Sequence, residues 1–260
     1  MFAKTVKKLK KVSYEPVLSI LAILLLWWLV QKVGRFPEYI LPTPTSVIKS
    51  LLAFYAPMLQ AIEWTLYEAL GGYFLSIAIS IPLGVLIVYS RFARAYILPI
   101  LVMTNSIPKS ALAPLFLLWA GYGAMSKILI AFLMAFFPIV INTAVGLYQI
   151  DQNKVNLVRS LEGSQWQVFS KVRFPNALPA VFAGLKMGIT LALIGAVVGE
   201  FVGGSKGIGV LILSATTEIN TAVVFAGVIV LSIVGILLFY AVEYLQKKLT
   251  PWYKPEKVQT

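Results

Sequence analysis

The stretch Thr65–Ile87 is TLYEALGGYFLSIAISIPLGVLI, and among its 23 residues Glu68 is the single charged one. About 20 consecutive, mostly apolar residues are enough for a helix to cross the hydrocarbon core of a bilayer. Gly71, Gly72 and Ser76 recur at close spacing, and such small residues allow helix backbones to approach each other in lipid. This stretch therefore predicts a membrane-spanning helix with a closely packed face.

Apolar stretches of similar length occur on both sides of this one. The 260-residue chain is 59% hydrophobic and 12% charged, whereas a soluble domain is closer to half apolar and a quarter charged. We predict an all-α membrane protein with about six transmembrane helices. The expected spans are Pro16–Val33, Ile62–Tyr89, Tyr96–Ala120, Ser126–Gln149, Leu178–Val202 and Thr221–Leu245.

The basic residues indicate an orientation for these spans. If the N-terminus is cytoplasmic, 15 of the 22 Lys and Arg residues fall in cytoplasmic segments and five fall outside, Lys127 among the latter. Short cytoplasmic loops of membrane proteins carry such an excess of positive charge. We expect a multi-pass protein of the bacterial inner membrane, in contact with lipid, with both termini in the cytoplasm. The net charge of +12 then needs no nucleic-acid partner.

The expected cytoplasmic segment Ile150–Ala177 has the pattern of two short helices separated by Gly163. Apolar residues recur at helical spacing before the glycine, and Trp166 and Phe169 follow in a second amphipathic turn. Exposed aromatic side chains on such a loop are typical of an interaction surface. The segment therefore predicts a cytoplasmic protein partner.

Two segments are expected on the outer face. The segment Leu41–Ala56 predicts a turn followed by an amphipathic helix. The run GGSKG at Gly203–Gly207 has neither the spacing nor the setting of a phosphate-binding loop, so we interpret it as a tight turn. Because the sequence has no Cys and no His, it offers no thiol, histidine or zinc chemistry, and we expect no catalytic or metal site.

Polar side chains within spans are costly and usually face a cavity or another helix. Lys109 lies in the Pro-flanked stretch Ile107–Pro114, and irregular backbone at membrane depth is tolerated where it lines a water-filled cavity. The alternative is that Lys109 forms a structural ion pair with an acidic residue, Glu68 or Glu200, and Glu200 could equally reach the membrane interface. The candidate residues of a translocation pathway are Glu68, Asn105, Lys109, Asn142 and Glu200.

Five blocks of the sequence, in this order, resemble the binding-protein-dependent transport permeases of the nitrate/sulfonate/taurine group. They are LPTPTSV at Leu41–Val47, the stretch at Thr65–Ile87, IPKSALAPLFLLWAGYG at Ile107–Gly123, FFPIVINTAVGL at Phe136–Leu147, and NALPAVFAGLKMGITLALIGAVVGEFVGGSKGIG at Asn176–Gly209. The resemblance extends from Leu41 to Trp252.

The resemblance implies the fold of a type I ABC importer permease and an alternating-access mechanism. It implies an external substrate-binding protein, a separate ATPase subunit that holds ATP and Mg, and a second permease chain, most simply in a homodimer. No cofactor is expected on this chain. Members of the group transport pyrimidine precursors, riboflavin, sulfonates, taurine or nitrate. The sequences IPKSALAPL and GEFVGG are more similar to the pyrimidine and riboflavin branch, and the sulfonate, taurine and nitrate branch remains the alternative.

The cytoplasmic segment matches the coupling motif of these permeases in part. Asn156 begins the triplet where the family has Glu-Ala-Ala, and Glu162 stands at the usual glycine, with Gly163 next to it. The resemblance implies that this segment docks in a groove of the ATPase. The coupling residues expected on that basis are Asn156, Glu162, Gly163, Ser164, Trp166, Phe169 and Pro175.

We divide the chain into a basic cytoplasmic tail (1–15), a first transmembrane helix with its outer connection (16–40), a permease domain (41–246) that contains the coupling segment (150–177), and a cytoplasmic tail (247–260). Two other functions stay open at this point. An ion-coupled secondary transporter could use Glu68 and Glu200 as coupling carboxylates. A non-transport scaffold of the membrane is the other possibility.

Overall fold

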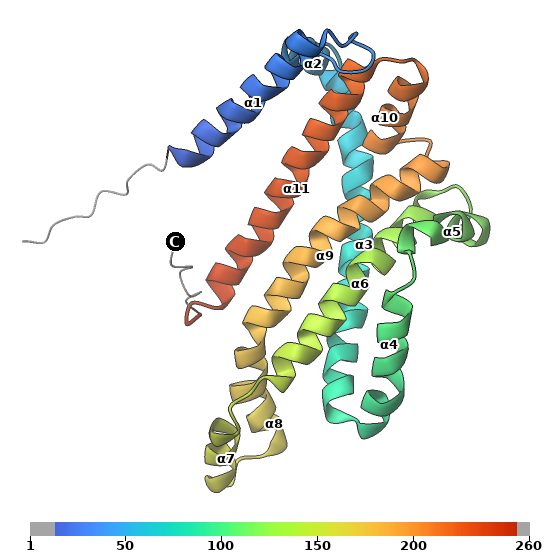
Figure 1. Ribbon diagram of the computed structural model, residues 1–260. Helices are drawn as coiled ribbons and strands as arrows, with labels where there is room; N and C mark the ends of the chain where they lie inside the picture. Colours follow the sequence, from blue (N-terminus) through green and yellow to red (C-terminus); the bar gives the residue numbers. More distant parts are fainter. Residues whose placement is uncertain (1–13, 254–260) are drawn as a thin grey trace, which may run out of the picture.

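The computed structural model describes residues 14–253 as a succession of helices, without a strand in that range (Figure 1). Most residues of the two predicted tails lie outside the described residues. The helices are α1 (Glu15–Gly34), α2 (Pro44–Ala53), α3 (Tyr55–Tyr89), η1 (Ala93–Ile97), α4 (Leu98–Asn105), η2 (Lys109–Leu112), α5 (Ala113–Ala120), α6 (Ala124–Tyr148), α7 (Gln152–Ser160), α8 (Gln165–Val168), η3 (Phe169–Arg173), α9 (Phe174–Gly203), α10 (Ile208–Thr217) and α11 (Thr221–Leu249).

The predicted spans are confirmed, with one of them broken. Five stretches of helix, α1, α3, α6, α8–α9 and α11, are long and apolar enough to cross a membrane. The third expected span, Tyr96–Ala120, is divided between η1–α4 and η2–α5, which meet at a bend of 90°. Pro108 lies between the two halves, where it cannot continue the α4 hydrogen-bond ladder. The irregular backbone that the Pro-flanked stretch predicts is therefore present.

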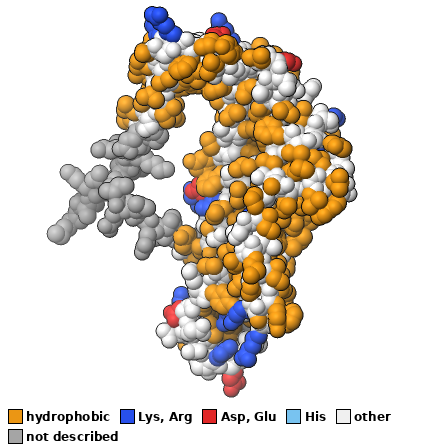
Figure 2. All heavy atoms as spheres, turned by 45° about the vertical axis from the view of Figure 1, so that its right-hand side comes forward, with side chains coloured by type: hydrophobic (Ala, Val, Ile, Leu, Met, Phe, Trp, Pro, Cys, Tyr) orange, Lys and Arg blue, Asp and Glu red, His pale blue; other side chains and the backbone are white. Residues whose placement is uncertain are grey.

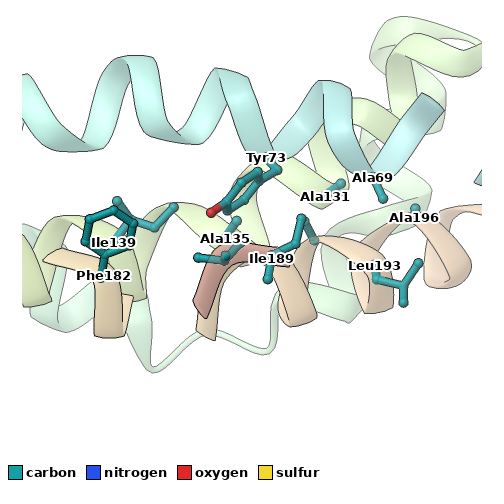
Figure 3. Packing of buried hydrophobic residues seen from close by; sticks show 11 residues of the cluster. Ala69, Tyr73, Ala131, Ala135, Ile139, Phe182, Ile189, Leu193 and Ala196 are labelled. Carbon is teal, nitrogen blue, oxygen red and sulfur yellow. The ribbon is translucent and has the colours of Figure 1, made fainter. Parts of the chain in front are cut away.

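Small residues hold the three central helices α3, α6 and α9 together. Figure 3 shows Ala69, Ala131, Ala135 and Ala196 at the contact among these helices, with Tyr73 beside them. Contacts this close require side chains that leave the backbones free to approach. This packing confirms the small-residue face expected for the first stretch.

Serine hydroxyls add polar contacts between α3 and α6. Ser76 Oγ donates to Phe132 O at 2.8 Å, and Ser80 Oγ donates to Phe136 O at 3.1 Å. Both acceptors are backbone carbonyls on the neighbouring helix. Inside lipid, where water is absent, such bonds satisfy the hydroxyl and tie the helices together.

The short helices α7 and α8 lie at one end of the bundle, which we call the loop end, and α2 and α10 lie at the opposite end (Figure 1). Hydrophobic side chains cover the length of the visible face, whereas charged side chains gather mainly at its two ends (Figure 2). This distribution is that of a protein with lipid around its middle and water at its ends.

The end opposite the loop end contains both elements expected outside the spans. Thr43 caps α2, because its Oγ1 accepts a hydrogen bond from Ser46 N at 3.1 Å, so the expected amphipathic helix is confirmed. The turn expected at Gly203–Gly207 is also present and connects α9 to α10. The 10-residue helix α10 itself was not expected, because it is too short to cross a membrane.

Helix α1 is separate from the rest of the bundle. It diverges from α11 toward the loop end (Figure 1), and its apolar window has no buried residue within this chain. Its contact with α11 is made near its C-terminal half, where Trp27 stacks on Phe225 with ring centroids 5.4 Å apart. An apolar surface of this kind is stable in lipid without a protein neighbour.

Candidate coupling loop and translocation cavity

The segment between α6 and α9 forms the helix–Gly–helix element that its sequence predicts. The Asp151 side chain caps α7 by accepting from Asn153 N at 2.9 Å. The chain then reverses at Glu162, which has a positive φ of 58°, and Gly163 N donates to Val158 O at 2.9 Å. A Cβ on Gly163 would collide with Val158, so this position requires glycine. The residue with left-handed backbone conformation is thus Glu162, at the position where the coupling motif of the family has glycine.

A capping box starts the second half of this segment. Ser164 Oγ accepts from Gln167 N, and Gln167 Oε1 accepts from Ser164 N, at 3.2 and 2.7 Å. These two bonds satisfy backbone donors at the start of α8. From there η3 and α9 follow without a break, so the segment is joined directly to both α6 and α9.

The predicted coupling residues differ in how far they are exposed. Trp166 is 71% exposed, whereas Phe169 is half-buried against Tyr89 and Phe174, with ring centroids 5.8 and 5.7 Å away. Phe169 therefore fixes the segment to the end of α3. The Trp166 ring lies 5.6 Å from the Phe169 ring and leaves most of its surface exposed for a further contact. Of the others, Asn156, Glu162 and Ser164 are exposed, and Gly163 and Pro175 are half-buried.

The bend between α4 and α5 opens a cavity of about 590 Å³ that is also lined by α6 and α9. Three predicted pathway residues, Asn105, Lys109 and Asn142, line it together, although they come from different elements. Pro138 of α6 lies on the same wall, and because it has no N–H, the carbonyl of Met134 loses its helical partner there. The cavity wall therefore has polar groups inside an apolar bundle.

Lys109 is held at the mouth of the break by Asn105. Its Nζ donates to Asn105 Oδ1 at 3.0 Å and to Asn105 O at 3.1 Å, and it lies 4.7 Å from the centre of the Phe137 ring. The alternative of an ion pair between Lys109 and Glu68 or Glu200 is wrong, because both carboxylates are engaged by other groups.

Those two carboxylates belong to a buried cluster at the opposite end of the bundle from the coupling segment. Glu68 Oε1 is 3.4 Å from Lys127 Nζ, and these side chains are 2% and 3% exposed. Glu200 accepts from Thr65 Oγ1 at 2.6 Å and from Gly209 N at 2.5 Å. The expectation that Glu200 reaches the interface is wrong, since its side chain is 1% exposed.

This cluster also caps α10. Thr65 Oγ1 accepts from Ile208 N at 2.9 Å, so α3 and α9 together satisfy the first two backbone donors of that helix. Gly207 has a φ of 115°, and a Cβ there would collide with the Glu200 carboxylate. The sequence prediction assigned Lys127 to an outer loop, and its role in the cluster was therefore missed.

A second cavity, of about 700 Å³, lies at the loop end between α6, α9 and the residues after α11. Its lining includes Gln149, Asn176 and Tyr253. Asn142 lines both cavities, and its Nδ2 donates to Pro138 O at 2.8 Å. The two cavities thus meet at one polar side chain along α6.

The comparison with family models covers most of the helical bundle. Residues 76–251 match the model described as binding-protein-dependent transport system inner membrane component. The chain belongs to this family. The matched range contains the coupling segment and the residues that line the cavity at the α4–α5 bend. It begins within α3, so α1 lies outside it.

Individual relatives agree with the family. A Haemophilus influenzae protein named "Probable ABC transporter permease protein" is 35% identical over 89% of this chain and 94% of its own length. The formylaminopyrimidine transport permease protein ThiX of Halalkalibacterium halodurans is 33% identical over 94% of this chain and 98% of its own. The taurine transport system permease protein TauC of Escherichia coli is 32% identical over 93% and 91%.

A solved structure shares the fold. The chain resembles a chain of the MetNI methionine ABC transporter in an inward facing conformation, with a TM-score of 0.67 and 20% sequence identity. The match covers 76% of this chain and 98% of the other. The predicted type I ABC importer permease fold is therefore confirmed.

These findings define the class of the protein. It is a multi-pass inner-membrane permease subunit of an ABC importer. The family works with an ATPase and an external substrate-binding protein. Membership in this family replaces both the ion-coupled and the scaffold alternatives.

Proposed function

We propose that this permease imports a small organic or anionic solute that an external binding protein delivers, driven by a separate ATPase subunit that binds ATP and Mg. The substrate classes that remain are a pyrimidine precursor, riboflavin, a sulfonate such as taurine, and nitrate. The names of relatives support the first three of these classes, since they include a formylaminopyrimidine, a riboflavin and a taurine permease.

The observation that carries the proposal is the apolar surface of the α7–α8 segment. Leu157, Leu161 and Trp166 are 63%, 75% and 71% exposed, and the segment projects beyond the apolar bundle (Figure 1). Large side chains exposed together in water are typical of a docking surface. The segment connects α6 to α9, so an ATPase bound there would act directly on two helices that line the cavities.

We place the loop end, and both termini, in the cytoplasm. The support is the positive charge of that end, where the coupling segment contains Lys154, Arg159, Lys171 and Arg173. We expect a second copy of the chain to complete the pathway. A homodimer with the pathway on its two-fold axis is the simplest closed arrangement.

Co-purification tests this proposal. The tagged chain is extracted from its native membrane in a mild detergent, and the bound proteins are identified by mass spectrometry. We expect an ATPase subunit in stoichiometric amount. A well-folded oligomer that contains this chain alone, and that takes up solute on an ion gradient, would overturn the proposal.

The substitution Trp166→Asp tests the coupling surface. A buried interface tryptophan contributes about 2 kcal/mol or more, so ATPase binding should weaken by about 30-fold or more. Trp166→Phe, which keeps an apolar ring, should retain binding. The measurements are ATPase recovery and ATP-driven uptake, with thermal unfolding as the control for the fold. Normal uptake by the Asp variant would exclude this surface. Phe169 is less suitable, because its ring packs against Tyr89.

A further inference from the structure

We propose that the cavity at the α4–α5 bend is a binding subsite for an anionic group of the transported solute, with the Lys109 ammonium as its charge partner. This inference rests on the proposed function, since it describes where the imported solute would bind. The expected ligand is an anionic group with several oxygen acceptors, such as a sulfonate or a carboxylate. This permease would then recognise the solute in addition to the binding protein.

The charge of the cavity is the first argument. Among the described residues that line it, Lys109 is the single charged one. No described carboxylate forms an ion pair with Lys109, and the buried carboxylates of Glu68 and Glu200 are held by Lys127, Thr65 and Gly209. A charge within a span is costly, and such a residue usually faces the bundle interior or a water-filled cavity and pairs with another group there.

The hydrogen-bond donors are the second argument. An ammonium group has three donors, and the described residues offer Lys109 two hydrogen-bond acceptors, both on Asn105, and the face of the Phe137 ring. The Asn105 amide N and the hydroxyls of Ser106 and Ser110 line the same cavity without a hydrogen-bond partner in the described part of the chain. The cavity therefore has unsatisfied donors beside a positive charge, which is the complement of an anion with several oxygen acceptors.

A purely structural role for Lys109 makes a different prediction. Its Nζ contacts the carbonyl of Asn105, the last residue of α4, and a positive charge stabilises the C-terminal end of a helix. If this were its whole role, replacing Lys109 would lower stability without changing how the cavity interacts with ions.

Because the chain has no cysteine, a single introduced thiol can report the electrostatic potential of the cavity. Ser106 is exposed within the cavity, so S106C places one thiol there. The variant is studied in the assembly as purified from membranes, in nanodiscs of phosphatidylcholine, a lipid without net charge. Its thiol is reacted with the anionic sulfonatoethyl methanethiosulfonate and with the cationic trimethylammonium-ethyl methanethiosulfonate, and labelling is followed by the mass of this chain.

We expect S106C to react faster with the anionic reagent. K109Q in the same background should lower the anionic-to-cationic rate ratio by about tenfold, because the lost unit charge acts with opposite sign on the two reagents. K109R should keep the ratio, and at S160C in α7 the ratio should not respond to K109Q. Ethanesulfonate should also slow labelling of S106C by a neutral methanethiosulfonate, whereas ethanesulfonamide should not.

An unchanged ratio in K109Q, equal protection by both compounds, or no labelling at Ser106 would each overturn the subsite. Recovery of the chain without an ATPase would instead contradict the proposed function, and the rate ratio would still report on the cavity.

Discussion

At the residue scale, Lys127 shows how two carboxylates are accommodated inside the bundle. It lies in the first turn of α6, within 3.4 Å of Glu68 Oε1, and it also interacts electrostatically with Glu200. Its ammonium is the sole cation paired with these groups among the described residues. Each of the three side chains is almost fully buried, so water cannot replace a missing partner.

Lys127→Met should therefore destabilise the protein by about 3–5 kcal/mol, because it leaves buried carboxylates without their cation. The double variant Lys127→Met/Glu68→Gln removes one negative charge as well and should recover part of the loss. Thermal unfolding in detergent measures both. Lys206→Met is the matched control, since Lys206 is exposed at the same end of the molecule and stacks on Trp64. A Lys127→Met protein as stable as the parent would show that the cluster has no energetic role.

Thr65 has a comparable role at the start of α10. Thr65→Val removes the donor to Glu200 and the acceptor for Ile208 N, and we expect a cost of about 1–3 kcal/mol for the groups left unpaired. Amide hydrogen exchange at Ile208 and Gly209 should accelerate in the same variant. Thr65→Ser keeps the hydroxyl and should retain slow exchange at both amides. Slow exchange in the Val variant would mean that the cap is formed by other groups.

The sequence was enough to predict which residues belong to the candidate site, but not which of them contact each other. Asn105, Lys109 and Asn142 were identified as polar residues within spans, and the structure places all three on one cavity. The grouping of Glu68 and Glu200 with Lys127 was not predictable, because their contacts depend on how α3, α6 and α9 are aligned. The sequence gives hydropathy along each helix and leaves this alignment undetermined.

At the scale of the helices, two adjacent glycines of α3 differ in their surroundings. A Cβ on Gly72 would lie 2.5 Å from Ala131 Cβ and 2.6 Å from the Ile128 carbonyl oxygen. A Cβ on Gly71 would meet the Ile128 side chain at 3.3 Å, and that side chain can move. Replacing Gly71 by alanine therefore tests mainly helix propensity, whereas replacing Gly72 tests mainly the packing of α3 against α6.

Gly72→Ala should destabilise the protein by about 1–3 kcal/mol through overpacking against the α6 backbone. Gly71→Ala should be neutral or stabilise by up to about 1 kcal/mol, because alanine is the better helix former. Thermal unfolding of the two variants side by side is the measurement. Equal effects would indicate that α3 and α6 are not in contact at this point.

The spans were predictable because each has a continuous apolar run, and the coupling segment was predictable from its helical spacing and its glycine. The bend in the third span could be located to the Pro-flanked stretch, but the angle of 90° could not, since it depends on the neighbouring helices. Helix α10 was missed because its ten residues give no spanning signal and its cap comes from residues distant in sequence.

At the scale of the whole molecule, α1 lies before the residues that match the family model, which begin at residue 76 within α3. Replacing Val17–Leu25 with an alternating Leu/Ala sequence should change stability by less than about 0.5 kcal/mol, since the large apolar side chains of this stretch are exposed within the chain. Trp27→Ala should cost more, because it removes the ring stacked on Phe225. Thermal unfolding and ATPase recovery measure both. Loss of the assembly in the Leu/Ala variant would contradict a lipid-facing α1.

The glycine contacts between α6 and α9 have a mechanical consequence. A Cβ on Gly184 would lie 2.8 Å from Pro138 O, and one on Gly195 would lie 2.7 Å from Ala131 Cα, so backbone touches backbone with little compressible material between. The two helices therefore form a stiff unit, and the α7–α8 segment is attached at one end of it. Because the 30 residues of α9 extend about 45 Å, a tilt of about 5° at that end moves the far end by about 4 Å. On the proposed function, a small movement of a bound ATPase would thus displace the far end of α9 by more than the width of a water molecule.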